Sequence, residues 1–213
     1  YSNTNYALLG LIALHRADTR PGKIDVGVGV FRDDAGRTPV MRAVKTAEAL
    51  LLETQDSKSY LGAEGDVGYT NLLGEIALGA QVRSERTTGV QTPGGTGALR
   101  LGAELLARAN REAVVWIGTP TWPNHEPIFA EAGLATRTHR FFDPASAAID
   151  FDAMIVDLGE ARPGDILLLH GCCHNPTGAG LTAAQWEATP ARFAARGRLP
   201  FIAPPYQGSA AGT

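Results

Sequence analysis

Two short apolar runs constrain the fold of this chain more than any other feature of its sequence. The first is AVVWI, residues 113–117, and the second is the apolar centre of DILLLH, residues 165–170. Each run has the length of a strand, and neither alternates between apolar and polar residues. A strand that is apolar on both sides must be covered on both faces, as in parallel sheets. We therefore expect an α/β fold in three layers, with a mostly parallel sheet flanked by helices.

Helical patterns separate the strand candidates along the chain. Thr38 followed by Pro39 predicts a helix N-cap and the first helical residue. In a later helix, the spacing of Leu101 and Leu105 predicts that both side chains face the core. We expect helices at 39–54, 69–78, 96–108, 124–132, 151–158 and 182–195, and further strands at 87–92, 136–142 and 199–203.

The composition argues against several classes of partner. The 213 residues carry a formal net charge of −3, which gives no attraction to nucleic acid or to an anionic membrane. The longest apolar stretch, residues 7–14, is too short to span a bilayer. The two cysteines, Cys172 and Cys173, are adjacent and a poor basis for a disulfide framework, so we expect a reducing, cytoplasmic setting.

The loops that follow the strands should bind the ligand, because parallel α/β sheets hold ligands beyond the carboxyl ends of their strands. One such loop is QTPGGTGA, residues 91–98, which leads into an expected helix. Gly94 and Gly95 would let a phosphate reach the free N–H groups of the first helical turn, and the Thr96 hydroxyl would add a donor. The alternative is a simple tight turn with an N-cap. The loop is neither a Walker A motif nor a GxGxxG fingerprint.

Two further loops carry candidate contacts for a flat ring. Trp122 follows the 113–117 run, where an exposed tryptophan can stack on a heteroaromatic ring, although a core or rim position is the alternative. HGCCHNPTG follows the second run, and Pro176 holds Asn175 in an extended conformation. Its histidines and cysteines also suggest a zinc site, but adjacent cysteines usually diverge, so we predict no metal.

Six segments occur in the same order as in one enzyme family: IDVGVGVFRDDAGRTPVMRAVKTAE, SKSYLGAEGD, QTPGGTGALR, PTWPNHEPIF, LLLHGCCHNPTG and YQGSAAG. The most specific element is HNPTG after an apolar strand. Over residues 23–212 the chain thereby resembles class I aminotransferases of the aspartate/aromatic type.

The resemblance implies a fold type I enzyme that depends on pyridoxal 5′-phosphate and works as a homodimer. Residues 1–38 would form the N-terminal arm and a small-domain segment, and residues 39–213 the N-terminal part of the cofactor-binding large domain. The implied reaction exchanges an amino group between an amino acid, aspartate or aromatic, and a 2-oxo acid.

The resemblance also implies roles for single residues. Gly94, Gly95 and Thr96 resemble the loop that binds the cofactor phosphate. Tyr60 resembles the tyrosine that reaches the phosphate of the neighbouring subunit, and Gly29 the glycine whose backbone meets the substrate carboxylate.

Further matching positions surround the cofactor ring. Trp122 resembles the tryptophan stacked on the pyridine ring. Asn175 and Tyr206 resemble the pair that forms hydrogen bonds with the phenolic oxygen of that ring. His125 and His174 resemble residues that lie behind the ring.

Two departures from the family pattern bear on activity. Ala203 stands where the family carries the aspartate that holds the protonated pyridine nitrogen. The family's cofactor-bonding lysine and its carboxylate-binding arginines match no residue in this sequence, so we expect the 213-residue chain to be inactive alone. The alternative to a transaminase is a truncated or degenerate non-catalytic derivative that keeps a phosphate-binding loop and a dimer surface. An unrelated phosphate-binding α/β module is the third reading.

Overall fold

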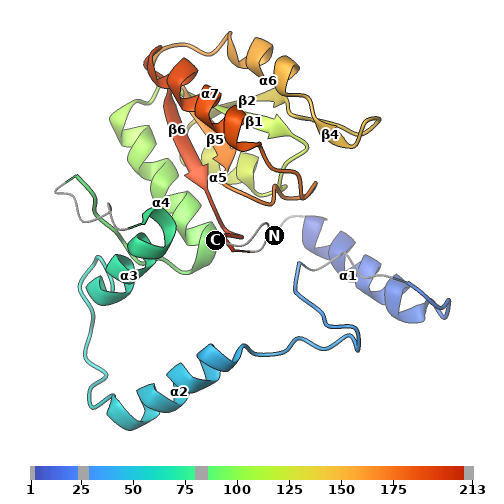
Figure 1. Cartoon of the computed structure of the whole chain (residues 1–213), viewed down its shortest axis with the longest axis vertical. Coiled ribbons are helices and arrows are strands. Elements are labelled where there is room, and N and C mark those ends of the chain that lie inside the picture. Colours follow the sequence, from blue (N-terminus) through green and yellow to red (C-terminus); the bar gives the residue numbers. More distant parts are fainter. Residues whose placement is uncertain (1–2, 24–28, 80–85, 209–213) are drawn as a thin grey trace. The chain divides into compact units, whose positions relative to one another are not determined.

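The computed structural model describes residues 3–23, 29–79 and 86–208. The chain divides into two compact units, Tyr1–Tyr60 and Leu61–Thr213, and Figure 1 colours it from blue to red along the sequence. Within the described ranges, no helix is both long and apolar enough to cross a membrane.

The first unit contains two helices, α1 (Asn3–Ala17) and α2 (Arg42–Thr54). The predicted start of the second helix at Thr38 and Pro39 is wrong, because the N-cap is Met41. The first backbone carbonyl to accept helical hydrogen bonds is that of Met41. Pro39 stays outside the helix, since the fixed φ of proline suits an extended segment as well as a helical turn.

The second unit is built on a four-stranded parallel sheet, which confirms the predicted α/β fold. Its strands are β1 (Val114–Thr119), β2 (Ala135–Arg140), β5 (Ile166–His170) and β6 (Leu199–Ala203). Their order across the sheet is β2-β1-β5-β6, so β1 and β5 are central among the described strands.

Helices cover both faces of this sheet (Figure 1). Ile166 and Leu168 of β5 point to one face and pack in a core with helices α4 and α5. Leu167 and Leu169 point to the other face and pack in a core with α6 and α7. This division explains why the run is apolar at every position. The covering helices are α4 (Gly94–Ala109), α5 (His125–Glu131), α6 (Phe151–Leu158) and α7 (Ala183–Ala194).

Helix α4 buries a different face from the one predicted. Leu101 and Leu105 are 46% and 69% exposed, whereas Leu99, Ala103 and Ala107 are buried in the core. The small side chains of Ala103 and Ala107 let the helix backbone approach the sheet closely, and the larger leucines are left outside. The prediction that Leu101 and Leu105 face inward is therefore wrong.

The segment before α4 is not the predicted strand 87–92, and no described strand pairs with it. Instead, the Gln91 N–H donates to the Glu64 carbonyl at 2.8 Å, and the Gln91 side chain accepts from the Asp66 N–H at 2.9 Å. The Gln91 N–H, which would pair with a neighbouring strand in a sheet, is thus used in a contact between two loops. Asp66 also caps helix α3 (Val67–Leu78) by accepting from a first-turn N–H.

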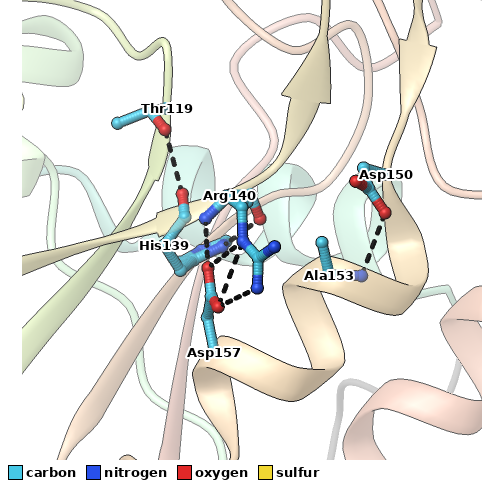
Figure 2. Close-up of polar contacts among 6 residues, drawn as sticks. All are labelled: Thr119, His139, Arg140, Asp150, Ala153 and Asp157. Atoms are coloured by element: carbon cyan, nitrogen blue, oxygen red, sulfur yellow. Dashed lines mark hydrogen bonds and ion pairs between the residues drawn. The ribbon is translucent and has the colours of Figure 1, made fainter.

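A short hairpin connects β2 with α6. Its strands, β3 (Phe142–Asp143) and β4 (Ala148–Ile149), are absent from the sequence-based expectations. The Asp150 side chain then accepts from the Ala153 N–H at 3.0 Å and caps α6. Figure 2 shows this cap.

An ion pair ties the carboxyl end of β2 to α6 (Figure 2). Asp157 accepts from the Arg140 backbone N–H at 2.8 Å and from its Nε at 2.9 Å. Hydrogen bonds from the Arg140 side chain lower the pKa of Asp157 to about 2. Next to this pair, the Thr119 hydroxyl donates to the His139 carbonyl at 3.1 Å and links the ends of β1 and β2.

Candidate functional site

The sheet brings three loops with predicted ligand contacts to one edge. Because β1, β5 and β6 run parallel, their carboxyl ends at Thr119, His170 and Ala203 lie on the same side of the sheet. In the β5–β6 register, His170 lies directly opposite Ala203. The loops after these three strand ends carry Trp122, Asn175 and Tyr206.

A chain of ring contacts runs across this edge. The Trp122 ring meets the His125 ring edge-on at 5.3 Å between centroids, and His125 meets His170 edge-on at 5.2 Å. The rings of His170 and His174 stack at 4.3 Å. Trp122 is half-buried and packs against the same core as Ala203. The predicted residues Trp122, His125 and His174 are thus brought together.

Asn175 connects the two loops that follow β5 and β6. Its side-chain Nδ2 donates to the Tyr206 hydroxyl at 3.0 Å, so the two predicted partners of one ring oxygen lie side by side. Its backbone N–H donates to His170 Nδ1 at 3.1 Å. The second bond requires an unprotonated Nδ1, because a charged imidazole has no acceptor.

The histidines of this cluster are held neutral. Burial lowers the pKa of His125 to about 4, of His170 to about 4 and of His174 to about 3. The Thr121 hydroxyl lies 2.7 Å from His125 Nδ1, and the Thr177 hydroxyl lies 2.9 Å from His174 Nδ1. At neutral pH these rings therefore supply hydrogen-bonding groups without a net charge.

A small cavity is lined by the carboxyl ends of β1, β2 and β5 and by the loops that follow them. Its volume of about 20 Å³ suits a single water molecule, which needs two or more polar partners. The side chains that can supply such partners are Thr121, His139, His170 and His174.

The predicted phosphate loop lies at the N-terminus of α4, which begins at Gly94. No side chain caps this end, and a Cβ built on Gly94 or Gly95 would meet nothing within 4 Å. Gly94 has a φ of +66°, which favours glycine, and its N–H already donates to the Thr92 carbonyl. Open space therefore faces the first helical turn, where backbone N–H groups lack helical partners. Exposed Thr96 lies in the same turn.

Gly97 allows the close packing of the turn at the start of α4. A Cβ at Gly97 would lie 2.7 Å from the Pro93 ring, so the close packing of these two residues excludes a side chain there. The GGTG motif thus combines two glycines that face open space with one that packing requires.

Gly29 and Tyr60 belong to the first unit, and both are exposed. Their predicted contacts with substrate and with the neighbouring subunit's phosphate stay predictions.

The cluster contains no carboxylate at the end of β6, where Ala203 is half-buried. Cys172 and Cys173, in the loop after β5, are free thiols. In the part of the chain that the structure describes, no three His, Cys, Asp or Glu side chains converge on a possible metal position.

Apart from the zinc reading that was rejected for His170, the sequence patterns assign no role to His170 and His139, yet both line the small cavity. His170 had a detectable signal, because it is the last residue of the most apolar strand and so lies at the edge where ligands bind. His139 had none, because it is the single buried residue of the polar strand β2 and lies between exposed Thr138 and Arg140.

Comparison with known proteins extends this description. Residues 21–213 match the family described as aminotransferase class I and II. The chain is 53% identical over 201 residues to a tyrosine aminotransferase of Rhizobium meliloti, covering 94% of this chain and 51% of that protein. It is 45% identical over 208 residues to an aspartate aminotransferase of Escherichia coli, covering 96% of this chain and 52% of that protein.

Solved structures share the fold. An aromatic amino acid aminotransferase with 3-indolebutyric acid superposes with a TM-score of 0.91 at 47% identity, over 96% of this chain and 52% of that one. An aromatic-amino-acid aminotransferase from Burkholderia pseudomallei, covalently bound to pyridoxal phosphate, superposes with a TM-score of 0.85 at 37% identity, over 92% of this chain and 50% of that one. The chain spans about half the length of the curated relatives it matches. The family match and the shared fold together establish that the chain belongs to the class I and II aminotransferases.

Proposed function

We propose that the protein containing this chain transfers an amino group between an amino acid, aspartate or aromatic, and a 2-oxo acid, with pyridoxal 5′-phosphate as cofactor. The observation that carries the proposal is the hydrogen bond between Asn175 Nδ2 and the Tyr206 hydroxyl at the carboxyl edge of the sheet. Two polar groups converge there, at the same edge of the sheet as the loop that carries the half-buried ring of Trp122. A flat ring with a polar substituent fits such a surface.

The residues present fit most of the cofactor. The open space at Gly94 and Gly95 and the free N–H groups of the first turn, with Thr96, suit its phosphate. Trp122 offers a ring face, and the Asn175–Tyr206 pair suits the phenolic oxygen. The ring nitrogen lacks a carboxylate partner, because the position has Ala203.

When bound, the cofactor would carry the amino group and take up the electron density released at the substrate's Cα. The residues of this chain would position it and tune its charge. The Asn175 amide and the Tyr206 hydroxyl would favour a negative phenolic oxygen, because hydrogen bonds to a charged form lower its pKa. His170 would hold the backbone of Asn175, and neutral His125 would support the Trp122 ring from behind.

The wider organisation of the protein follows the family in this proposal. Residues 1–38 would form an arm and a small-domain segment, and residues 39–213 the first part of the large domain. In a homodimer, Tyr60 would reach the phosphate of the other subunit, and the backbone of Gly29 would meet the substrate carboxylate. The free cysteines are consistent with a cytoplasmic location.

Ala203 favours a second candidate, a non-catalytic derivative that keeps the phosphate loop. Without an opposite charge at the pyridine nitrogen, the cofactor loses its main electron sink. The phosphate loop does not depend on that position, so cofactor binding would survive the loss of catalysis.

Joining this chain to the C-terminal half of the Rhizobium meliloti tyrosine aminotransferase would test the proposal. The joined protein with Ala203→Asp is assayed with tyrosine or aspartate and 2-oxoglutarate. We expect amino transfer above the rate with free pyridoxal phosphate. A folded, cofactor-loaded joined protein without activity toward either amino acid would contradict the proposal.

A further inference from the structure

A second cavity, of about 330 Å³, lies at the amino end of β6, the opposite end of that strand from Ala203. Its walls come from α6, the end of α7 and the turn that leads into β6. Three arginines take part in this lining, and the described lining residues include no acidic side chain. The residues that line the cavity include Ile155, Gly159, Arg192, Phe193, Arg196 and Arg198.

Arg198 is the buried member, with 6% of its surface exposed. Its Nη2 donates to the Gly159 carbonyl at 2.9 Å, and its guanidinium lies 5.6 Å from the centre of the Phe193 ring. Its Nε and Nη1 are buried and have no hydrogen-bond partner among the described residues. Buried charged donors without partners are costly, and native proteins rarely leave them so.

The nearby protein charges do not satisfy this guanidinium. Asp165 is the carboxylate that acts on it, but Asp165 makes its hydrogen bonds elsewhere. Its Oδ2 accepts from Trp116 Nε1 at 3.0 Å and from the Arg162 N–H at 2.8 Å, and its Oδ1 accepts from the Val114 N–H at 3.1 Å. Burial and the like charge of Arg196 lower the pKa of Arg198. An arginine stays protonated in proteins, so the positive charge persists in the cavity.

We propose that this cavity binds a small, multiply charged oxyanion, either the phosphate group of a phosphate monoester or a dicarboxylate. Guanidinium groups form strong, charge-assisted hydrogen bonds with these groups. Arg192, Arg196 and Arg198 all line the cavity and would supply the positive charge that holds the anion. Nε and Nη1 of Arg198 have almost no accessible surface, so the guanidinium would turn toward the cavity to donate from them. The volume lies at the small end of the range for ligand pockets, about 300–1,000 Å³. The site is independent of the proposed transamination.

Calorimetric titration of the purified 213-residue chain tests the proposal, with inorganic phosphate and malonate as probes at constant ionic strength. Arg198→Met removes the buried charge, and Arg111→Met removes one charge at an exposed position outside the cavity. We expect Arg198→Met to weaken binding of at least one probe about tenfold or more, and Arg111→Met to leave it unchanged. A loss of phosphate binding alone in Arg198→Met identifies a phosphate monoester, and a loss of malonate binding alone identifies a dicarboxylate. Phosphate that binds equally well to Arg198→Met and Arg111→Met occupies another site, such as the loop at the start of α4.

A third variant guards against unfolding of Arg198→Met. Arg196→Met changes an exposed side chain at the rim and should weaken the same binding severalfold. The proposal is overturned if neither probe binds to the unmodified chain. It is also overturned if Arg196→Met binds the probe as tightly as Arg111→Met does. The same holds if Arg198→Met is folded and binds the probe as tightly as Arg111→Met does.

Discussion

At the scale of single residues, the hydrogen bond from the Asn175 N–H to His170 Nδ1 links the sheet to the candidate site. His170, the last residue of β5, accepts from the Asn175 N–H, and Asn175 in turn donates to Tyr206. Protonation of His170 at Nδ1 would replace an acceptor with a donor and break the first bond. Burial lowers the pKa of His170 to about 4, which keeps the acceptor available at neutral pH.

The lowered histidine pKa values predict a loss of stability in mild acid. The folded-state pKa values are about 4 for His125, about 4 for His170 and about 3 for His174, against 6.5 for the ordinary group. Between about pH 6.5 and pH 4 the unfolded chain binds protons that the folded chain does not, so the free energy of unfolding falls as pH falls. Urea unfolding at several pH values in this window measures the effect.

The variant His125→Gln serves as the control for this pH effect, because it removes one titrating ring. The dependence of its urea midpoint on pH should be shallower than that of the unmodified chain. A midpoint that stays constant through the same window would show that the cluster does not exclude protons.

Ala203 predicts a large difference in rate in a protein that has the lysine-bearing half. Restoring a carboxylate with Ala203→Asp would raise the pKa of the cofactor's ring nitrogen and strengthen the electron sink. In the joined protein we expect the aspartate variant to be faster by about 10³-fold or more. Cofactor affinity should change less, because the phosphate loop is separate. Equal turnover numbers for the two proteins would mean that the nitrogen has another partner.

The loop positions predicted that Trp122 and Asn175 lie at one edge of the sheet, because loops after parallel strands meet there. The place of His125 came from the family resemblance. The family resemblance supplied the pairing of Asn175 with Tyr206. The ring stack of His170 on His174 could not be predicted, since it depends on how one loop folds back over a strand end.

At the scale of elements, the sequence predicted helix boundaries best where the capping residues lie within the segment itself. Helix α7 begins after Thr182, which forms a capping box with Gln185, and the predicted range of 182–195 is close to the observed one. The buried face of α4 could not be read from its own residues. Gly102 approaches β6 so closely that a Cβ there would lie 2.6 Å from the Phe201 ring, which is a property of two elements together.

A matched pair of leucine truncations tests which face of α4 carries the packing. Leu99 is buried and Leu105 is 69% exposed on the same helix. Leu99→Ala should lower the free energy of unfolding by about 2–5 kcal/mol, because it leaves a cavity. Leu105→Ala should change it by no more than about 0.5 kcal/mol. A larger loss for Leu105→Ala than for Leu99→Ala, measured by urea unfolding of the chain, would favour the face predicted from the leucine spacing, and similar losses would contradict the burial of Leu99 alone.

At the scale of the whole molecule, many large apolar side chains are exposed to solvent. Helix α3 has no buried residue, and its Leu72 and Ile76 are 62% and 67% exposed. Ile202, in β6, which lies at one edge of the sheet formed by the described strands, is 50% exposed. The relatives that the chain matches are about twice as long, so in them further residues are available to cover such faces.

The exposed apolar residues predict association of the 213-residue chain. Uncovered apolar patches and an unpaired strand edge promote pairing between molecules. We expect the chain to bind an apolar-surface dye and to sediment as more than a monomer, and the joined protein to bind less dye per chain. A monomer that unfolds cooperatively and binds no dye would contradict this expectation.

The central claim is that the N-terminus of α4 and the ring contacts at the sheet edge bind a phosphorylated cofactor. Titration of the 213-residue chain with pyridoxamine 5′-phosphate and with pyridoxamine tests it most directly, because neither needs a lysine. Gly95→Asp places a negative charge in the loop, and Gly95→Asn is the neutral control of the same shape. The open space at Gly95 accommodates either side chain. We predict that the phosphorylated ligand binds at least about tenfold more tightly than pyridoxamine, and that Gly95→Asp loses this preference while Gly95→Asn keeps more of it. Equal affinity for the two ligands, or identical binding by the two variants, would contradict the claim.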